Sequence, residues 1–374
     1  MTDRRSLLIL SFSKIATDPR VIKQVRYFAD RYDVTTCGYG PTPDGVVEHI
    51  ELDGSLPRKL DGRIITTRIY RLAYWQQPAM RGARRQLKGR TFDAVLANDA
   101  DALPVAVSLK PRFGIHADMH EYFPRWHEED EAWRRRIGPY YLWLCRRYLT
   151  RARSVTTVSG GLAREYGTIV DVPVGVVANA TPFHELEPGE VGERIRIVHS
   201  GAAMPRRYLE RTIEAAGRLP GSVELDLYVV PVYKDYFADL QAQAAATENV
   251  RVHEPVPYEE LVGVLHRNDV GIFVVPPVTF NLEWTLPNKI FDYVQARLGI
   301  VTGPSPEMAS VVRENGLGAV TGGFEVDDIE ATLATLDKET VAGWKSASHA
   351  AARELAAEAE VEKWGDAIEK LLTS

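Results

Sequence analysis

The chain has 374 residues, a net charge of −6, 45% hydrophobic and 26% charged residues, so we expect a globular protein of two domains. No apolar run approaches the roughly 20 residues that cross a bilayer. The apolar run after Arg4 and Arg5 is only about seven residues long and no small-residue cleavage site follows, which favours a buried first strand over a signal peptide. Two cysteines give no disulfide framework, so we expect a reducing cytosol.

The charge is unevenly distributed. Residues 1–178 hold 28 Lys and Arg against 20 Asp and Glu, whereas the remainder holds 17 against 31. A basic first half indicates a surface that meets something anionic. The alternative is that the charge balance drifts along the chain without a function.

Apolar, β-branched runs alternate with helical segments. In the first half the predicted strands are 7–13, 34–40, 93–99, 114–120, 154–159 and 174–179. Such continuous runs are typical of strands buried on both faces of a parallel sheet. Asp18-Pro19 predicts a helix start, with a buried face formed by Val21, Ile22, Val25 and Phe28.

A segment rich in Pro, Gly and Glu at 178–194 predicts a linker. The strand pattern then restarts at 196–201, 224–230, 249–255, 270–276 and 299–303. The fold class is therefore α/β, with two doubly wound Rossmann-like domains, 1–180 and 181–357, facing across a cleft. The tail at 339–373 predicts a long helix, whose last part, about 358–374, could pack back on the first domain.

The stretch LPNKIFDYV predicts a helix with Pro287 at its first position, capped by Thr285 or Leu286. The first turn of a helix binds anions through unpaired N–H groups. Lys289 lies in that turn, where a cation opposes the helix dipole unless a phosphate sits between them. Asn288, Lys289 and Asp292 can share one face, where Asp292 could accept hydroxyl donors of a ribose. The alternative is an exposed Lys–Asp pair on a core helix.

Two other segments that hold candidate residues follow predicted strands. In HADMHEYFP, His116 and His120 at four-residue spacing could suggest a metal, but a strand passing into a loop does not bring two such imidazoles together. His120 could instead hydrogen-bond a substrate hydroxyl or be a structural histidine. In HSGAAMPRRYLE, Gly201 allows a close backbone approach, and Arg206 and Arg207 could clamp phosphate or be solvated.

The first strand-to-helix loop holds Ser13, Lys14, Asp18 and Arg20 but no Gly-x-Gly-x-x-Gly fingerprint, and no Walker-type loop occurs. Two segments, 80–90 and 132–153, mix arginines with aromatic residues. These segments suit an anionic membrane surface, or a half-buried helix with a charged outer face. No recognition motif points to nucleic acid. Asp99 and Asp101 resemble a two-aspartate metal motif, but this spacing is common.

Together these segments resemble a GT-B glycosyltransferase, most closely the retaining family 4 group. The resemblance covers nearly the whole chain and is carried by ATDPRVIKQVRYFADRYDV, DMHEYFP, HSGAAMPRRYLERTIEA, VHEPVPYEELVGVLHRNDVGIFVVP and LPNKIFDYVQARLGIVTG. The order and spacing of the five segments make it specific, whereas each alone is weak.

The resemblance implies a role for each candidate residue. Lys289 and Arg207 would hold the donor diphosphate close to the Gly201 backbone, and His120 would sit at the transferred sugar. The remaining donor-binding candidates are Asp292 and Asn288 near the ribose, the backbone of Glu254 to Val256 at the base, and Asn281 and Glu283 at sugar hydroxyls. The first-loop or acceptor candidates are Ser13, Lys14, Arg20 and Glu121.

Three departures from the family pattern leave the sugar unnamed. Trp284 stands where many members have a first glutamate, eight residues before Asp292. Ala202 replaces an arginine after the Gly-loop glycine, and SFSKIA replaces a glycine-rich first loop.

The resemblance further implies transfer of a sugar from a nucleotide-diphosphate donor to a glycan or lipid-linked acceptor, with retention and without metal or cofactor. The expected setting is cell-envelope polysaccharide synthesis by a cytoplasmic protein, peripheral at the inner membrane face. The alternatives are a nucleotide-sugar 2-epimerase and a non-catalytic GT-B binding protein. Base, acceptor, linkage and oligomeric state stay open.

Overall fold

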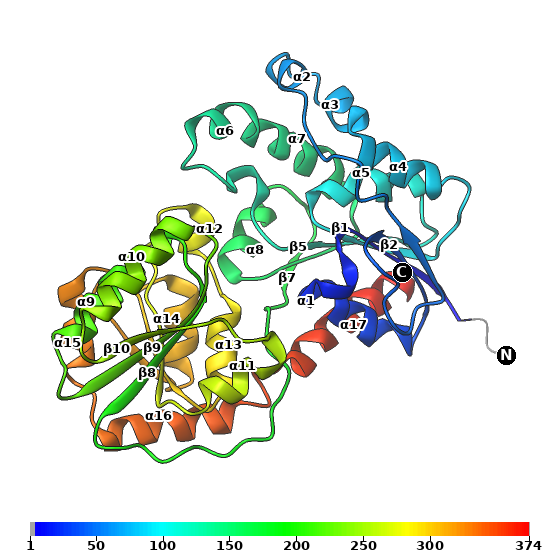
Figure 1. Ribbon diagram of the computed structural model, residues 1–374. Coiled ribbons are helices and arrows are strands. Elements are labelled where there is room, and N and C mark those ends of the chain that lie inside the picture. Colours follow the sequence, from blue (N-terminus) through cyan, green and yellow to red (C-terminus); the bar gives the residue numbers. More distant parts are fainter. Residues whose placement is uncertain (1–3, 374) are drawn as a thin grey trace. The chain divides into compact units, whose positions relative to one another are not determined.

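The computed structural model describes residues 4–373, which divide into two compact units (Figure 1). The first unit contains residues up to Ala178, a short return at Thr279–Asn281, and the chain from Val361 onward. The second contains Asn179–Val278 and Leu282–Glu360. The chain therefore leaves the first unit, builds the second, and finishes in the first.

The first unit is built on a seven-stranded parallel sheet of order β3-β2-β1-β4-β5-β6-β7. Its strands are β1 Ser6–Lys14, β2 Asp33–Tyr39, β3 Glu48–Glu51, β4 Ala94–Asn98, β5 Gly114–Met119, β6 Ser154–Thr157 and β7 Val174–Val176. Its helices are α1 Pro19–Ala29, α2 Gly62–Thr66, α3 Tyr70–Gln76, α4 Pro78–Gln86, α5 Leu103–Leu109, α6 Glu131–Arg136, α7 Gly138–Tyr148, α8 Gly160–Gly167 and most of α17 Ala357–Thr373.

Helices cover both faces of this sheet (Figure 1). On one face α1 and α17 pack together, and Phe28 of α1 shares a buried cluster with Trp364 and Ile368 of α17 and with Leu7 of β1. The helix start at Asp18-Pro19 is confirmed, because the Asp18 carboxylate accepts from two backbone N–H groups of the first turn.

The second unit has a six-stranded parallel sheet of order β10-β9-β8-β11-β12-β13. Its strands are β8 Ile195–Ala202, β9 Val223–Val230, β10 Val250–His253, β11 Val270–Phe273, β12 Gly299–Thr302 and β13 Gly318–Val320. Its helices are α9 Leu209–Gly217, α10 Lys234–Ala245, α11 Tyr258–Leu265, part of α12 Phe280–Glu283, α13 Asn288–Gln295, α14 Pro306–Glu314, α15 Val326–Leu333 and α16 Lys338–Ala351.

The predicted fold class, two doubly wound α/β domains, is confirmed, and each predicted strand is present. The edge strands β3 and β13 were not predicted, since one is largely polar and the other is three residues long. The single long helix predicted at 339–373 is wrong, because turns at 352–355 separate α16 from α17. Among the described residues, no helix is both long and apolar enough to span a membrane.

Candidate functional site

In the second unit, basic side chains converge where β8 ends. Gly201 has φ +150°, and a Cβ built there would lie 2.7 Å from Arg207 Nη1, 3.4 Å from Lys289 Cε and 3.6 Å from His199 Nε2. Arg207 comes from the turn after β8, and Lys289 from the first turn of α13. A side chain at 201 would therefore displace Arg207, so glycine keeps the space at this strand end open.

His199 is buried beneath this space. Its Nδ1 lies 3.0 Å from the carbonyl oxygen of Ile272, so Nδ1 carries the hydrogen, and its ring stacks on Phe273. Burial, followed by the nearby charges of Arg207 and Lys289, lowers the pKa of His199 to about 3, although the bond to Ile272 opposes the shift. Its Nε2 has no hydrogen-bond partner among the described residues. Burial also lowers the pKa of Arg207. Cations held in a half-buried site are arranged for an anion.

The start of α13 differs from the prediction. Pro287 is the N-cap, with extended backbone, and the helix begins at Asn288. Pro287 therefore occupies the cap position predicted for Thr285 or Leu286 and not the first helical position. Thr285 and Leu286 precede the cap. No side-chain hydrogen bond caps this helix start, and the predicted anion at its first turn stays a prediction.

Asp292 shares a face of α13 with Lys289, as predicted, but it is buried, so the alternative of an exposed Lys–Asp pair is wrong. It is fully buried, and its Oδ1 accepts from Thr181 Oγ1 at 2.5 Å. Its Oδ2 lies 3.4 Å from Lys289 Nζ. The carboxylate thus orients Lys289, and its predicted contact with a ribose stays a prediction.

The other donor-binding candidates are spread around this unit. Glu254 is exposed and Val256 half-buried after β10, Asn288 opens α13, and Glu283 ends α12. Their contacts with base and sugar stay predictions.

Asn281 is used differently from the prediction. It belongs to the first unit, where its Oδ1 accepts from the Tyr122 N–H at 2.7 Å and its Nδ2 lies 3.3 Å from the Tyr122 carbonyl. Its carboxamide is therefore bonded to the backbone after β5, and its predicted contact with a sugar hydroxyl stays a prediction.

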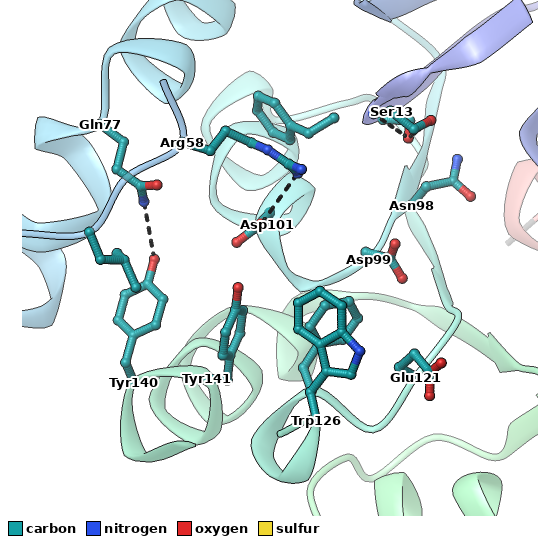
Figure 2. A pocket seen from close by; sticks show the side chains of 14 residues that line it. Ser13, Arg58, Gln77, Asn98, Asp99, Asp101, Glu121, Trp126, Tyr140 and Tyr141 are labelled. Carbon is teal, nitrogen blue, oxygen red and sulfur yellow. Dashed lines mark hydrogen bonds and ion pairs between the residues drawn. The ribbon is translucent and has the colours of Figure 1, made fainter. Parts of the chain in front are cut away.

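The first unit holds a cavity of about 340 Å³ at the ends of β1, β4 and β5 (Figure 2). The lining residues are Ser11, Phe12, Ser13, Arg58, Leu60, Gln77, Asn98, Asp99, Asp101, Glu121, Phe123, Trp126, Tyr140 and Tyr141. Ser13 and Glu121, which were predicted as first-loop or acceptor contacts, both line this cavity. Lys14 is exposed at the end of β1 and does not line the cavity.

The aromatic residues of 132–153 were predicted to lie on an exposed surface, but Tyr140 and Tyr141 do not. Tyr140 is fully buried and Tyr141 is 8% exposed, so they face the interior and the cavity. The arginines of α6 and α7 remain exposed. The segment is therefore a half-buried pair of helices with a charged outer face.

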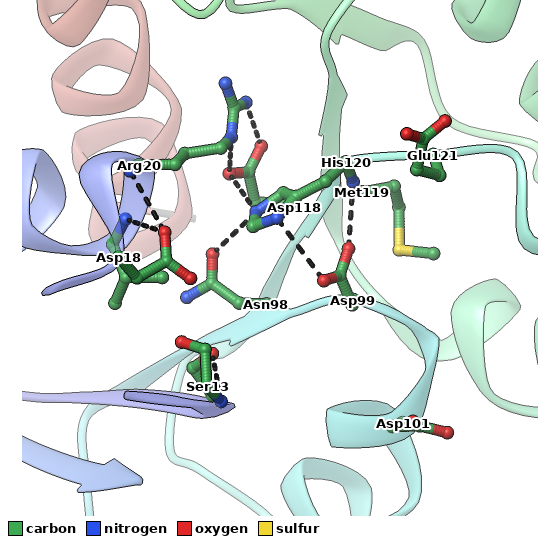
Figure 3. Close-up of polar contacts among 12 residues, drawn as sticks. Ser13, Asp18, Arg20, Asn98, Asp99, Asp101, Asp118, Met119, His120 and Glu121 are labelled. Atoms are coloured by element: carbon green, nitrogen blue, oxygen red, sulfur yellow. Dashed lines mark hydrogen bonds and ion pairs between the residues drawn. The ribbon is translucent and has the colours of Figure 1, made fainter. Parts of the chain in front are cut away.

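His120 lies between two carboxylates behind this cavity (Figure 3). Its Nδ1 is 3.3 Å from Asp99, and its Nε2 is 3.4 Å from Asp118 and 3.2 Å from Asn98 Oδ1. Burial alone would lower the pKa of His120, but Asp99 and Asp118 outweigh it and raise this pKa above its ordinary value. Both ring nitrogens of His120 thus face acceptor oxygens, an arrangement that favours the imidazolium over the neutral ring.

Arg20 is an interior residue, which corrects its prediction as a first-loop contact. It is 4% exposed and pairs with both oxygens of Asp118 at 2.7 Å. Its guanidinium also donates to the Val177 carbonyl and lies over the Trp364 ring. Despite burial, which opposes it, Arg20 holds the pKa of Asp118 well below its usual range.

His116 and His120 do not converge on a metal. His116 is buried and bonded to Ser154 and Thr156, and burial lowers its pKa to about 4. Within residues 4–373, no group of three or more His, Cys, Asp or Glu side chains could hold a metal ion.

Asp99 was not among the predicted site residues, because the spacing of Asp99 and Asp101 is common in sequences. Its φ of 68° and ψ of 167° lie in a region that non-glycine residues rarely occupy. Its N–H donates to the Asp118 carbonyl and its Oδ1 accepts from the His120 N–H, both at 2.9 Å. Such strain typically costs about 1–3 kcal/mol and clusters at functional sites. No sequence signal marks it.

No protein-family model and no curated protein matches the chain. Solved structures do match. The chain is similar to HepE from Anabaena in complex with UDP and glucose, with 13% identity and a TM-score of 0.69 over 98% of this chain and 100% of that chain. It is also similar to sucrose-phosphate synthase from Thermosynechococcus elongatus, with 12% identity and a TM-score of 0.73 over 99% and 100%.

A third match is WaaG, a glycosyltransferase involved in lipopolysaccharide biosynthesis, with 12% identity and a TM-score of 0.64 over 96% and 98% of the two chains. Identities this low establish the fold alone, and this fold is the GT-B fold that the sequence predicted.

Proposed function

We propose that this chain is a glycosyltransferase that moves a sugar from a nucleotide-diphosphate donor to a hydroxyl of a glycan or lipid-linked acceptor. The observation that carries the proposal is the convergence of Arg207, Lys289 and His199 on the open strand end at Gly201. Two cations beside an uncapped helix start and a glycine backbone form a site for a diphosphate.

The second unit would act on the leaving group. As the bond between the anomeric carbon and the phosphate oxygen breaks, negative charge grows on the diphosphate. Arg207, Lys289 and the N-terminus of α13 would stabilise this charge. Asp292 keeps Lys289 in place. Because fixed cations supply this role, we propose transfer without a metal ion.

We also propose retention at the anomeric carbon. The departing phosphate oxygen takes the proton of the acceptor hydroxyl, and the acceptor oxygen bonds to the same face of the sugar from which the phosphate leaves. No protein nucleophile is needed. His120, Glu283 and the backbone near Glu254 keep their predicted roles at the sugar and the base. An inverted product anomer would contradict this part of the proposal.

The structural neighbours support the donor class. HepE was crystallised with UDP, with UDP and glucose, and with UDP-glucose. The involvement of WaaG in lipopolysaccharide biosynthesis supports an acceptor of the cell envelope. We propose that this acceptor is used at an anionic membrane surface, reached through the exposed arginines of the basic segments 80–90 and 132–153 and not through the buried tyrosines of the latter.

The first test is thermal stabilisation by UDP, GDP, ADP, CDP and dTDP, with and without EDTA. A nucleotide at about 100 times its Kd should add roughly 2.7 kcal/mol of stability. We expect one nucleotide to stabilise the protein regardless of EDTA, and Lys289→Ala and Arg207→Ala to abolish the shift. Lys338→Ala, an exposed lysine of the same unit, is the matched control and should keep it.

Two outcomes would redirect the proposal. If no nucleotide stabilises the protein, the anion site is not a donor site and the chain is better described as a non-catalytic GT-B protein. If the donor sugar is epimerised by the enzyme alone, in the absence of acceptor, the chain is a nucleotide-sugar 2-epimerase.

A further inference from the structure

One buried nitrogen at the end of β8 has no hydrogen-bond partner. His199 is 2% exposed, and its Nδ1 donates to the Ile272 carbonyl oxygen at 3.0 Å. Its Nε2 is then a bare acceptor, and no hydrogen bond reaches it within residues 4–373. The hydroxyl of Tyr293 does not supply one, because it lies 3.1 Å from the same Ile272 oxygen. Buried polar atoms rarely stay unpaired, so this nitrogen is a candidate for a bond that forms only with a ligand.

This nitrogen lies beside the cations of the second unit. His199 and Gly201 are two residues apart on β8, so they share a face of the strand. A Cβ built at Gly201 would lie 3.6 Å from His199 Nε2, 3.4 Å from Lys289 Cε and 2.7 Å from Arg207 Nη1. A single point therefore lies close to the bare nitrogen and to both cationic side chains. A phosphate group that bridges the two cations would come close to Nε2.

The charged groups around His199 all oppose a proton on its ring. Burial and then the charges of Arg207, from the turn after β8, and Lys289, from α13, lower the pKa of His199. The carboxylate of Asp292 on α13 does not offset them, because it already faces Lys289 at 3.4 Å. Burial raises the pKa of Tyr293, so this phenol stays neutral. Without an anion, the imidazole of His199 is therefore uncharged.

A diphosphate would reverse this balance. Its two negative charges offset those of Arg207 and Lys289, which removes the repulsion between these cations and a proton on Nε2. The proton turns a bare acceptor into a donor, and an imidazolium N–H forms a charge-assisted hydrogen bond to a phosphate oxygen. An opposite charge within about 4–6 Å changes a pKa by about 1–3 in favour of the charged form.

We propose that His199 binds a proton together with the diphosphate, so that the site gains an imidazolium as a further cation when the anion arrives. The identity of this anion as the diphosphate of a sugar donor rests on the proposed function. The coupling of anion and proton follows from the residues of the site. Because the complex holds the proton more tightly than the free protein, the affinity for a diphosphate rises as the pH falls below about 6.

The first test observes the ring nitrogens of His199 by NMR in the isotope-labelled full chain, from pH 8 to pH 5. The ligands are inorganic pyrophosphate, UDP-glucose, GDP-mannose, ADP-glucose and dTDP-glucose. We expect Nε2 to stay bare in the free protein and to become protonated toward pH 5 at saturating ligand. His199→Asn identifies the signal. His266, whose Nδ1 lies 3.0 Å from the Ala296 carbonyl, is the internal control and should not respond to the ligand.

Affinities give a second measure. The diphosphate of a nucleotide sugar does not titrate between about pH 5 and pH 8, so calorimetry with the donor that binds reports protonation of the protein. We expect binding to be about three- to tenfold tighter at pH 5 than at pH 8. His199→Asn keeps an N–H for the Ile272 carbonyl but lacks Nε2, and its affinities should agree within about twofold. His266→Asn should keep the wild-type dependence.

Arg207→Gln tests the electrostatic cause without any ligand. Because it removes one of the two cations, Nε2 should take up its proton at a higher pH than in the wild-type protein. Lys338→Gln, at an exposed lysine of the same unit, is the control and should leave this titration unchanged. Circular dichroism checks that each variant is folded.

The inference is overturned if Nε2 stays bare at pH 5 with the site saturated, or if Arg207→Gln does not change the titration of His199. A chain that binds a donor with a bare Nε2 keeps the proposed function and loses only this inference. A chain in which pyrophosphate protonates His199 but no donor binds keeps the coupling and loses the proposed function. Failure of every ligand to bind at about 10 mM overturns both.

Discussion

At the scale of single residues, the first unit concentrates charge around one imidazole. Asp99 reaches His120 from a strained backbone, and Asp118 reaches it from the interior, where Arg20 holds that carboxylate ionised. The geometry supports a histidine that stays protonated and fixed in orientation. Its predicted task at the transferred sugar would then be electrostatic stabilisation and hydrogen-bond donation rather than removal of a proton.

The raised pKa of His120 predicts a pH-dependent contribution to stability. Its charged form is favoured in the folded state, so the stabilisation is complete below the unfolded pKa of about 6.5 and is lost as pH rises through the folded value. The destabilisation caused by His120→Gln, measured by urea denaturation, should therefore be larger at pH 6 than at pH 9.

His127→Gln serves as the control, because His127 is half-buried beside the rings of Trp126 and Trp133, and its Nδ1 lies 3.6 Å from the exposed carboxylate of Glu129. Its effect should vary less between the two pH values. An effect of His120→Gln that grows with pH would mean that the neutral imidazole is the stabilised form.

At the scale of elements, the end of β8 is the most sensitive point of the donor site. Gly201→Ala would place a methyl group 2.7 Å from Arg207 Nη1 in a backbone conformation that alanine rarely adopts. We expect Gly201→Ala to weaken nucleotide binding at least about tenfold, since Arg207 must move, and to destabilise the protein by roughly 1–2 kcal/mol. Calorimetry with the nucleotide found by thermal shift measures the affinity.

Gly343→Ala is the matched glycine control. Gly343 lies inside α16 with nothing within 4 Å of the added methyl group. This substitution should leave the affinity unchanged and stabilise the protein by about 0.5–1 kcal/mol, because alanine favours a helix. Equal affinities of the two variants would remove Gly201 from the binding site.

Elements were more predictable from the sequence than the directions of their side chains. The strands stand out because parallel strands are buried on both faces and form continuous apolar runs. The spacing of Lys289 and Asp292 shows that they share a face of α13 but not that this face is covered. The covering residue, Thr181, is 111 positions away in the sequence.

The same limit applied in the first unit. Arg20 looked like a loop residue because its partner Asp118 is 98 positions distant. The bond of Asn281 to Tyr122 could not be predicted either, because the two residues are 159 positions apart. The cavity could not be predicted at all, since its wall combines residues from β1, α7 and the segments after β4 and β5, whose positions only the folded chain defines.

At the scale of the whole molecule, the charge asymmetry of the sequence corresponds to an exposed basic surface on the first unit. Arg81, Arg84 and Arg85 are exposed on α4, above a buried face that includes Met80 and Ala83. Each basic residue near an anionic bilayer contributes about 1 kcal/mol. The proposed contact with an anionic membrane is therefore expected to involve this surface.

Vesicle sedimentation tests this surface. We expect the protein to bind vesicles that contain phosphatidylglycerol at low salt, and to bind phosphatidylcholine vesicles poorly. Replacing Arg81, Arg84 and Arg85 together by Gln should weaken binding by roughly 100-fold. The control replaces Lys234, Arg313 and Lys338, three exposed basic residues of the second unit, by Gln. Binding that is equal for both lipids, or lost equally in both triple variants, would contradict the proposal.

The placement of α17 has a consequence for how the protein folds during its synthesis on the ribosome. Trp364, Ile368 and Leu371 complete the core around β1 and α1, yet they are synthesised after every residue of the second unit. Domains generally fold from the N-terminus onward during synthesis. Here the order should be reversed: the second unit, complete at residue 360, can fold while the first still exposes the apolar surface that α17 will cover.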